Sequence, residues 1–257
     1  MVRNNLNGVQ AAKVRIINNF KRLLKYFFRL LSLEVSWRTP GSDPSLQILS
    51  AIRLKKCNVV FDIGANAGQF ALDLRSCGYD GKIISFEPLS SARKMLLKKS
   101  ARDNNWEMHR QTAVGDFNGE IEINIAGNSV SSSVLSMLNS HSSVAPESIY
   151  VGKEIVPMCS LDSVADIYLK PEDNLFIKID TQGFEWQVLE GARDTLKKAE
   201  GVLCELSLIP LYKNQHLWRE IVDRLEADGF SLWAIQKGFT DSVTGRSLQV
   251  DAIFLRN

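Results

Sequence analysis

The sequence predicts an α/β fold in which helices cover both faces of a doubly wound sheet of seven mostly parallel strands. Short apolar runs alternate with segments of helical length from residue 58 to the end of the chain. The runs are almost continuously apolar, as in parallel strands that are buried on both faces. The last two runs have no helix between them, so we expect the last strand to run antiparallel.

Length and composition are those of a folded globular protein. The 257 residues are 45% hydrophobic and 23% charged, which excludes a disordered, collagen-like or disulfide-stapled chain. The four cysteines form no Cys-x-x-Cys pair, and their irregular spacing predicts reduced thiols in a cytoplasmic protein. No apolar run reaches the roughly 18 residues of a membrane-spanning helix, so any contact with the inner membrane surface is expected to be peripheral.

The net charge of +2 hides an uneven distribution. Residues 1–38 hold eight basic side chains against one acid, which gives this segment +7 and leaves −5 for the rest. Within it, residues 9–33 predict an amphipathic helix with apolar side chains on one face and basic ones on the other. The breaker-rich linker RTPGSDP, residues 38–44, follows, so we expect two parts, residues 1–44 and 45–257.

The predicted helix at residues 9–33 has three interpretations. It covers the core of the body or of a partner in a homodimer, it lies on an anionic membrane, or it binds nucleic acid. Nucleic acid is the least favoured, because no recognition motif or aromatic stacking platform accompanies the basic residues. We therefore predict no nucleic-acid partner and keep the core or homodimer and the peripheral membrane contact as alternatives.

The body is predicted to alternate strands and helices. Gly78 ends one helix, Pro88 ends one strand, and Ser90 and Ser91 are expected to cap the helix that follows. The stretch 126–157 is predicted to be an irregular, partly serine-rich insertion. The predicted strands are residues 58–63, 82–87, 108–114, 120–125, 174–180, 201–208, 230–236 and 248–256, and the predicted helices are residues 69–77, 90–104, 161–168, 184–198 and 215–228.

The loop after the first strand, FDIGANAGQF at residues 61–70, is the first candidate site. Gly64 and Gly68 permit a tight turn and let a ligand approach the backbone, but the spacing G-x-x-x-G is not the dinucleotide fingerprint. Asp62 precedes the first glycine and repels a pyrophosphate, so it suits a ligand with an ammonium group and no phosphate. S-adenosylmethionine (AdoMet) is such a ligand, and the alternative is a turn that binds nothing.

An acid at the end of the second strand extends this candidate site. Glu87 lies 23 residues after Gly64, where a carboxylate accepts hydrogen bonds from ribose hydroxyls in nucleotide-binding α/β folds. The third strand ends in AVGD, where Asp116 either meets the adenine amine or forms a turn. The residues predicted to bind AdoMet are Asp62, Gly64, Ala65, Asn66, Gly68, Glu87, Pro88, Ala113 and Asp116.

The segment KIDTQGFEWQVLEGA, residues 178–192, is the next candidate site. Asp180 is expected at the tip of the fourth parallel strand, beside the first, where it faces a transferred methyl group. Lys178 points to the same side of the sheet and either contacts the substrate or neutralises Asp180. Glu185, in the first turn of the next helix, either contacts the substrate or complements the helix dipole.

Three further side chains are candidates for the reaction itself. Glu205 lies between apolar residues of the fifth strand, where a carboxylate needs a partner; together with Asp180 it is predicted to hold a divalent metal or to supply a general base. His141, in the serine-rich insertion, is an alternative base if that insertion forms a lid. Tyr212 either stacks against a sugar ring or packs in the core.

These segments together resemble a known family. FDIGANAGQF, FEP, AVGD, SSSVL, LDS and IKIDTQGFEWQVLEGA, with a late Pro-Leu-Tyr and the closing VDAIF, look like the FkbM family of AdoMet-dependent methyltransferases over roughly residues 57–256. The resemblance implies a class I methyltransferase (Rossmann-like) fold and O-methylation of a hydroxyl on a sugar, glycolipid or natural product. It does not specify the small-molecule or glycan acceptor, and the helix at residues 9–33 lies outside it.

Two other functions are weighed against this one. A nicotinamide-dependent oxidoreductase has a similar sheet, but the missing G-x-G-x-x-G and the antiparallel last strand argue against it. A non-catalytic membrane-docking module would use the basic helix and bind no AdoMet.

Overall fold

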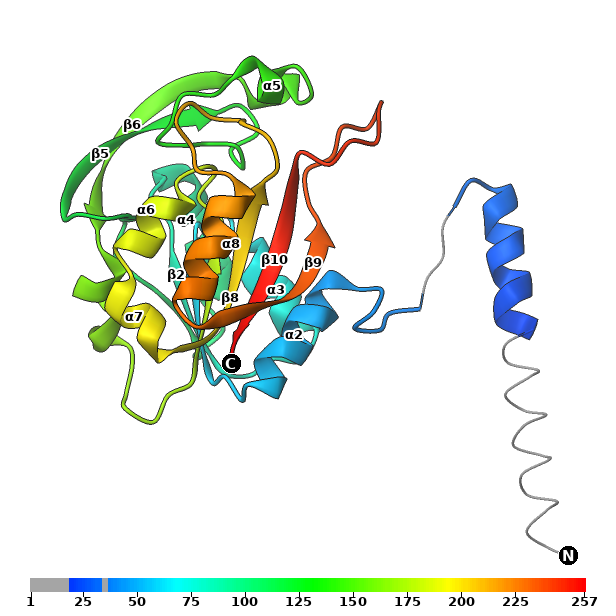
Figure 1. Cartoon of the computed structure of the whole chain (residues 1–257), viewed down its shortest axis with the longest axis horizontal. Coiled ribbons are helices and arrows are strands. Elements are labelled where there is room, and N and C mark those ends of the chain that lie inside the picture. The colour runs from blue at the N-terminus through cyan, green and yellow to red at the C-terminus, as the bar shows by residue number, and fades with distance from the viewer. Residues whose placement is uncertain (1–18, 34–36) are drawn as a thin grey trace, which may run out of the picture. The chain divides into compact units, whose positions relative to one another are not determined.

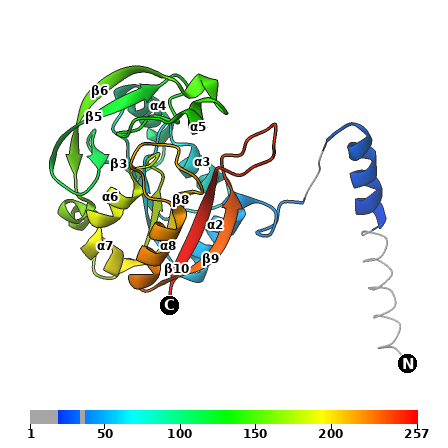
Figure 2. The ribbon, with the colours of Figure 1, turned by 45° about the horizontal axis from the view of Figure 1, so that its top comes forward.

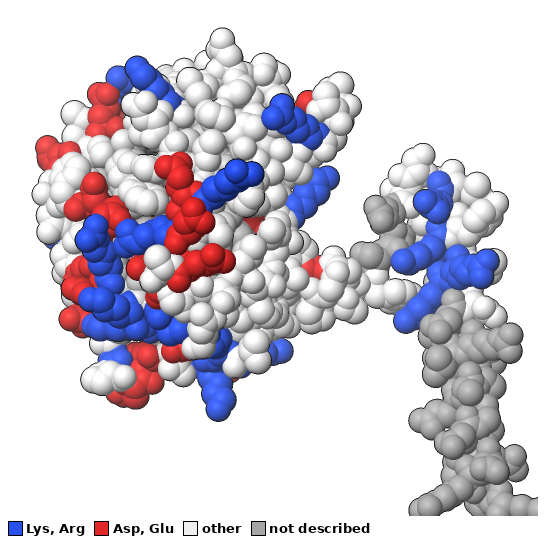
Figure 3. All heavy atoms as spheres, in the orientation of Figure 1, with Lys and Arg blue, Asp and Glu red and all other residues white. Residues whose placement is uncertain are grey.

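The computed structural model describes residues 19–33 and 37–257, and contacts within the chain divide it into two units at Asp43 and Pro44. In the first unit, residues 19–30 form a helix (Figure 1). Residues 9–18 of the predicted amphipathic helix lie outside the described residues. Several basic side chains of this helix gather on the face that Figure 3 shows. Within the described part of the chain, no helix has the length and apolar character needed to cross a bilayer.

The second unit is built on a seven-stranded sheet in the order β3-β2-β1-β7-β8-β10-β9. β10 pairs antiparallel with both neighbours, and every other pairing that the described strands make in this sheet is parallel. This confirms the predicted α/β fold of the class I methyltransferase kind. The strands are β1 (Val59–Ile63), β2 (Lys82–Phe86), β3 (Trp106–Met108), β7 (Leu175–Ile179), β8 (Ala199–Ser207), β9 (Phe230–Lys237) and β10 (Gln249–Arg256).

Helices cover the two faces of this sheet, as Figures 1 and 2 show. Strand alternation sends successive side chains to opposite faces, so Phe61 joins one core while its neighbour Val60 joins the other. The core on the face of Val60 includes α2 (Pro44–Leu54), α3 (Gln69–Ser76) and α4 (Ser90–Ser100). The core on the face of Phe61 includes α6 (Glu185–Glu190), α7 (Arg193–Lys198) and α8 (Trp218–Ala227).

A second, three-stranded sheet has the order β4-β6-β5. It consists of β4 (Ala113–Val114), β5 (Gly119–Ala126) and β6 (Tyr150–Cys159). The predicted third strand, residues 108–114, was therefore wrong, because its two ends belong to different sheets. The predicted irregular insertion was also wrong over most of β6. Polar and glycine residues interrupt the apolar pattern of β6, whose outer residues are exposed, so it carries no clear strand period.

Other differences from the predicted elements have local causes. α2 was missed, although Pro44 at its start and the buried Ile48, Leu49 and Ile52 follow a helical pattern. The predicted helix at 184–198 breaks at Gly191, where a Cβ atom would lie 1.8 Å from the carbonyl oxygen of Gly115.

One predicted helix and one predicted helix cap also differ from the structure. Residues 161–168 form two short 3₁₀ turns, Leu161–Ser163 and Ala165–Ile167, separated by Val164. No serine side chain caps α4; the backbone N–H of Ser90 donates instead to the Glu154 carboxylate. Glu154 is supplied by β6, so this cap depends on a distant segment.

Candidate active site

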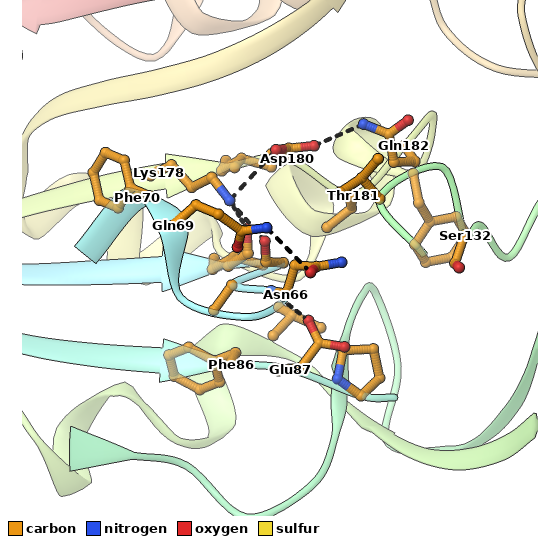
Figure 4. Close-up of a pocket in the computed structure, with 18 of the residues that line it drawn as sticks. Asn66, Gln69, Phe70, Phe86, Glu87, Ser132, Lys178, Asp180, Thr181 and Gln182 are labelled. Atoms are coloured by element: carbon orange, nitrogen blue, oxygen red, sulfur yellow. Dashed lines mark hydrogen bonds and ion pairs between the residues drawn. The ribbon is translucent and has the colours of Figure 1, made fainter. Parts of the chain in front are cut away.

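A cavity of about 470 Å³ opens at the carboxyl ends of β1, β2 and β7 (Figure 4). This size is within the range of small-molecule sites. Its walls come from the loop after β1, the ends of β2 and β7, the start of α2 and the serine-rich segment before β6. Six residues predicted to bind AdoMet line it, as do two from the next candidate segment: Gly64, Ala65, Asn66, Glu87, Pro88, Ala113, Lys178 and Asp180.

The loop after β1 needs glycine for close packing. Gly64 has φ +73°, and a Cβ atom there would lie 1.9 Å from the carbonyl oxygen of Asp180. The N–H groups of Gly64 and Ala65 both donate to Phe86 O, at 3.1 and 3.0 Å. Gly68 has φ +83°, and a Cβ there would lie 2.7 Å from Leu96. Gly64 thus brings β1 against β7, whereas Gly68 packs against the core and does not line the cavity.

Asp62 lies beneath the cavity rather than on its surface. Its side chain is 0% exposed, accepts a hydrogen bond from Ser85 Oγ at 3.2 Å, and pairs with Lys178 Nζ at 3.2 Å from Oδ1. Burial raises the pKa of Asp62, and the nearby Lys178 ammonium opposes that rise. Here the ammonium partner expected for Asp62 is a side chain of the protein itself.

Lys178 joins the floor of the cavity to its wall. Nζ donates to Gly64 O at 2.7 Å and lies 3.6 Å from Asp180 Oδ2. Burial alone lowers the pKa of Lys178, but the carboxylates of Asp62 and Asp180 outweigh it and hold this pKa above its usual value. The side chain is therefore a buried cation that neutralises both acids, which is one of the two predicted roles.

Glu87 ties the loops after β1 and β2 together. Its Oε2 accepts the N–H of Asn66 at 2.7 Å (Figure 4), and its Oε1 accepts the N–H of Leu89 at 2.8 Å. Burial raises the pKa of Glu87 to about 7, although both N–H groups favour the ionised form. Each oxygen keeps a further lone pair, so the side chain can still accept hydrogen bonds from the hydroxyl groups of a ligand in the cavity.

A carboxamide links the two predicted catalytic acids. Gln182 Nε2 donates at 2.9 Å to Asp180 Oδ1 and at 2.9 Å to Glu205 Oε2, and its Oε1 accepts the Tyr212 hydroxyl at 2.9 Å. Gln182 has φ +54°, in the left-handed region that disfavours most side chains. The sequence predicted that Asp180 and Glu205 act together, but it did not predict that Gln182 links them.

The two linked acids have different surroundings. Asp180 lines the cavity with 39% of its side chain exposed, whereas burial, with the charges of Asp180 and Glu185 nearby, raises the pKa of Glu205 well above its usual range. Glu205 therefore holds a proton more readily than an exposed glutamate does. Among the described residues, no group of three or more His, Cys, Asp or Glu side chains is arranged to hold a metal ion.

Glu185 stabilises the loop after β7 instead of facing the cavity. Its Oε1 accepts the N–H of Thr181 and the N–H of Gly183, each at 3.0 Å. Burial raises its pKa to about 7. This geometry departs from the predicted contact with a substrate.

Three further predicted residues lie away from the cavity lining. His141 is 3% exposed, with its ring centroid 5.3 Å from that of Tyr212 and 5.1 Å from that of Phe239, so it is a core side chain and not an exposed lid base. Tyr212 is fully buried and reaches the site only through Gln182. Asp116 is exposed and follows Gly115 at its contact with Gly191.

The cavity also has a wall that the sequence did not predict. Ser45 and Ile48 of α2, Gln236 of β9 and Asp251 of β10 line it. Asp251 pairs in register with Glu205 across β10 and β8, and burial raises its pKa to about 6. The pairing of β10 with β8 and β9 brings Gln236 and Asp251 to the site.

Similar solved structures include a fibrillarin/Nop5p complex (13% identity, covering 84% of this chain and 83% of that chain, TM-score 0.47). Others are magnesium protoporphyrin IX methyltransferase from Synechocystis with bound SAM (11%, 92% and 97%, 0.44) and precorrin-6y C5,15-methyltransferase from Geobacter metallireducens (13%, 87% and 93%, 0.42). No curated protein matches the chain. The methyltransferase FkbM domain model matches residues 62–232, and the chain therefore belongs to the FkbM methyltransferase family.

Proposed function

We propose that this protein is an AdoMet-dependent O-methyltransferase whose acceptor is a hydroxyl of a sugar, glycolipid or natural product. The observation that carries the proposal is one continuous cavity whose lining includes Glu87 at the end of β2 and Asp180 at the end of β7. A nucleoside-binding acid and a candidate base are thus at two points of the same cavity.

The residues of the cavity fit AdoMet. Glu87 offers acceptor oxygens for the ribose hydroxyls, and the loop residues Gly64, Ala65 and Asn66 line the same cavity. Pro88 and Ala113 add apolar surface. Asp180 supplies negative charge near the site where a sulfonium would bind. AdoMet, when bound, supplies an electrophilic methyl group.

Asp180 is the proposed general base. A hydroxyl becomes a good nucleophile as it loses its proton, and a positioned carboxylate contributes about 10²–10⁴-fold to the rate. Lys178 Nζ and Gln182 Nε2 contact different oxygens of Asp180, which fixes the plane of the carboxylate. Glu205 does not line the cavity, so it is the poorer candidate base; its proposed role is to hold Gln182.

We also propose a cytoplasmic location for this protein. All four cysteines are free in the structure, which supports a reducing, cytoplasmic compartment. The proposed partner at the site is a small-molecule or glycan acceptor.

Methyl transfer from isotopically labelled AdoMet tests this proposal. The enzyme is incubated with sugars, a glycolipid and a polyhydroxylated natural product, and with an amine acceptor of similar size, and the products are analysed by mass spectrometry. We expect label in an ether linkage and a kcat for Asp180→Asn lowered by about 10²–10⁴-fold. Asp116→Asn, an exposed carboxylate away from the cavity, is the matched control. Label only on the amine, or full activity of Asp180→Asn, would refute the proposal.

A further inference from the structure

The helix at residues 19–30 exposes a row of large apolar side chains. Phe20 is 60% exposed, Leu23 68%, Phe27 57% and Leu30 69%. Their spacing places all four within a third of the helix circumference, because an α-helix has 3.6 residues per turn. Isolated exposed apolar residues are ordinary, but a contiguous row of this kind marks an interaction surface.

The opposite face of the same helix is entirely basic. Residues 19–33 contain no acid, and their four charged side chains are Lys21, Arg22, Lys25 and Arg29. Lys21, Lys25 and Arg29 follow one another at four-residue spacing, which puts like charges side by side and destabilises a helix in water. A second copy of the helix would leave this repulsion in place, whereas an anionic surface relieves it.

An aromatic side chain completes the surface. Trp37 is 49% exposed, and Lys21 Nζ lies 4.8 Å from the centre of its ring. Tryptophan is enriched where membranes meet water, because its ring is apolar and its N–H is polar. Apolar bulk on one face, basic charge on the other and a neighbouring tryptophan are together typical of helices that lie in a bilayer interface.

We propose that residues 19–33, together with Trp37, dock the protein on the surface of an anionic bilayer. The row Phe20, Leu23, Phe27 and Leu30 enters the acyl boundary, and the basic face lies at the anionic headgroups. This docking surface shares no residue with the lining of the cavity and does not depend on the proposed reaction. It assigns a partner to a segment that the methyltransferase FkbM match, residues 62–232, leaves out.

Vesicle co-sedimentation of the full chain tests the proposal. The vesicles are phosphatidylcholine alone, or phosphatidylcholine mixed with phosphatidylglycerol, each at low and high salt. We expect binding to the anionic vesicles that salt weakens, since screening shortens the reach of the charges. Weaker binding to the neutral vesicles is expected because burial of the apolar row alone is marginal.

Two sets of substitutions separate charge from apolar burial. The triple variant Lys21→Gln, Lys25→Gln and Arg29→Gln keeps helix propensity and removes three charges. The expected loss of partitioning is on the order of a hundredfold. The second variant, Leu23→Gln with Phe27→Gln, removes apolar burial at constant charge and should also lose binding.

The matched control changes the same net charge elsewhere. Lys94, Lys98 and Lys99 are exposed on α4, and their replacement by glutamine should leave vesicle binding unchanged. All variants are checked for AdoMet binding, which reports on the cavity alone, so failure of the reaction and failure of docking are distinguishable. Equal binding to neutral and anionic vesicles, or an equal loss in the α4 control, would overturn the proposal. It would also be overturned if the chain bound no vesicles and instead formed a dimer that the Leu23→Gln, Phe27→Gln variant abolished.

Discussion

Substituting methionine for Lys178 removes the ammonium group that faces Asp62 and keeps a flexible apolar side chain. Asp62 is 0% exposed and the Lys178 side chain 8% exposed, so the substitution leaves a buried carboxylate without its cation. Removing one partner of a buried ion pair costs about 3–5 kcal/mol. Because the whole free energy of unfolding of a domain is only about 5–15 kcal/mol, we expect a large loss of stability.

The loss should depend on pH. Burial raises the pKa of Asp62 in the folded protein even with Lys178 present, and without Lys178 the rise is larger. The folded variant then binds more protons than the unfolded chain, whose Asp pKa is about 3.9. Its stability therefore falls as pH rises from about 4 through the raised folded pKa. We expect a smaller loss at about pH 5 than at about pH 8.

Urea unfolding followed by circular dichroism measures this effect at both pH values. The control Lys170→Met removes an exposed lysine and should change the free energy of unfolding by less than about 0.5 kcal/mol. The double variant Asp62→Asn with Lys178→Met removes the buried charge and should recover part of the loss. A loss below about 1 kcal/mol that is equal at both pH values, or a double variant no more stable than the single one, would refute the reasoning.

Three further predictions concern the cavity. Gly64→Ala should abolish AdoMet binding and lower Tm, because its Cβ would lie 1.9 Å from the carbonyl oxygen of Asp180. The control Gly245→Ala has a similar φ of +74° but nothing within 4 Å, so it measures the cost of backbone strain alone. Equal effects of the two substitutions in calorimetry and thermal melting would contradict this reasoning. Gln182→Glu should lower kcat for methyl transfer without loss of AdoMet affinity, because the new side chain can no longer donate to both Asp180 and Glu205 and adds negative charge beside Asp180. An unchanged kcat would argue against this bridging role of Gln182. Burial raises the pKa of Glu87 from 4.5 to about 7, so the folded protein binds the extra proton and its stability falls as pH rises through that window. Glu87→Gln should show a flatter stability profile in urea unfolding at pH values across that window, and an identical profile would contradict the assigned shift.

The sequence predicted those parts of the fold and site that depend on neighbours along the chain. The missing helix before β10 predicted its antiparallel direction, and the sheet shows it. The spacing of Gly64, Glu87 and Asp180 after their strands predicted one shared site, because parallel strands bring their carboxyl ends to the same edge. All three line one cavity.

What the sequence missed depends on contacts between distant segments. In the sequence, Gln182 is an ordinary loop residue, and only the folded chain brings Asp180, Glu205 and Tyr212 into contact with it. His141, predicted as an alternative base in a lid, is buried because Tyr212 and Phe239 pack against its ring. No local pattern around these residues reports such contacts. β6 was missed for a related reason, since its strand character comes from pairing with β5 rather than from an apolar period.

Calorimetric titration with AdoMet tests the central claim most directly. The account predicts binding of one AdoMet per chain to the wild type. Glu87→Ala should weaken it by about 10–100-fold, since a hydrogen bond to a charged group contributes about 1.5–3 kcal/mol. Glu120→Ala, an exposed glutamate of β5, should bind like the wild type. Absence of binding to the wild type, or the same affinity for Glu87→Ala in a protein that melts normally, would contradict the account.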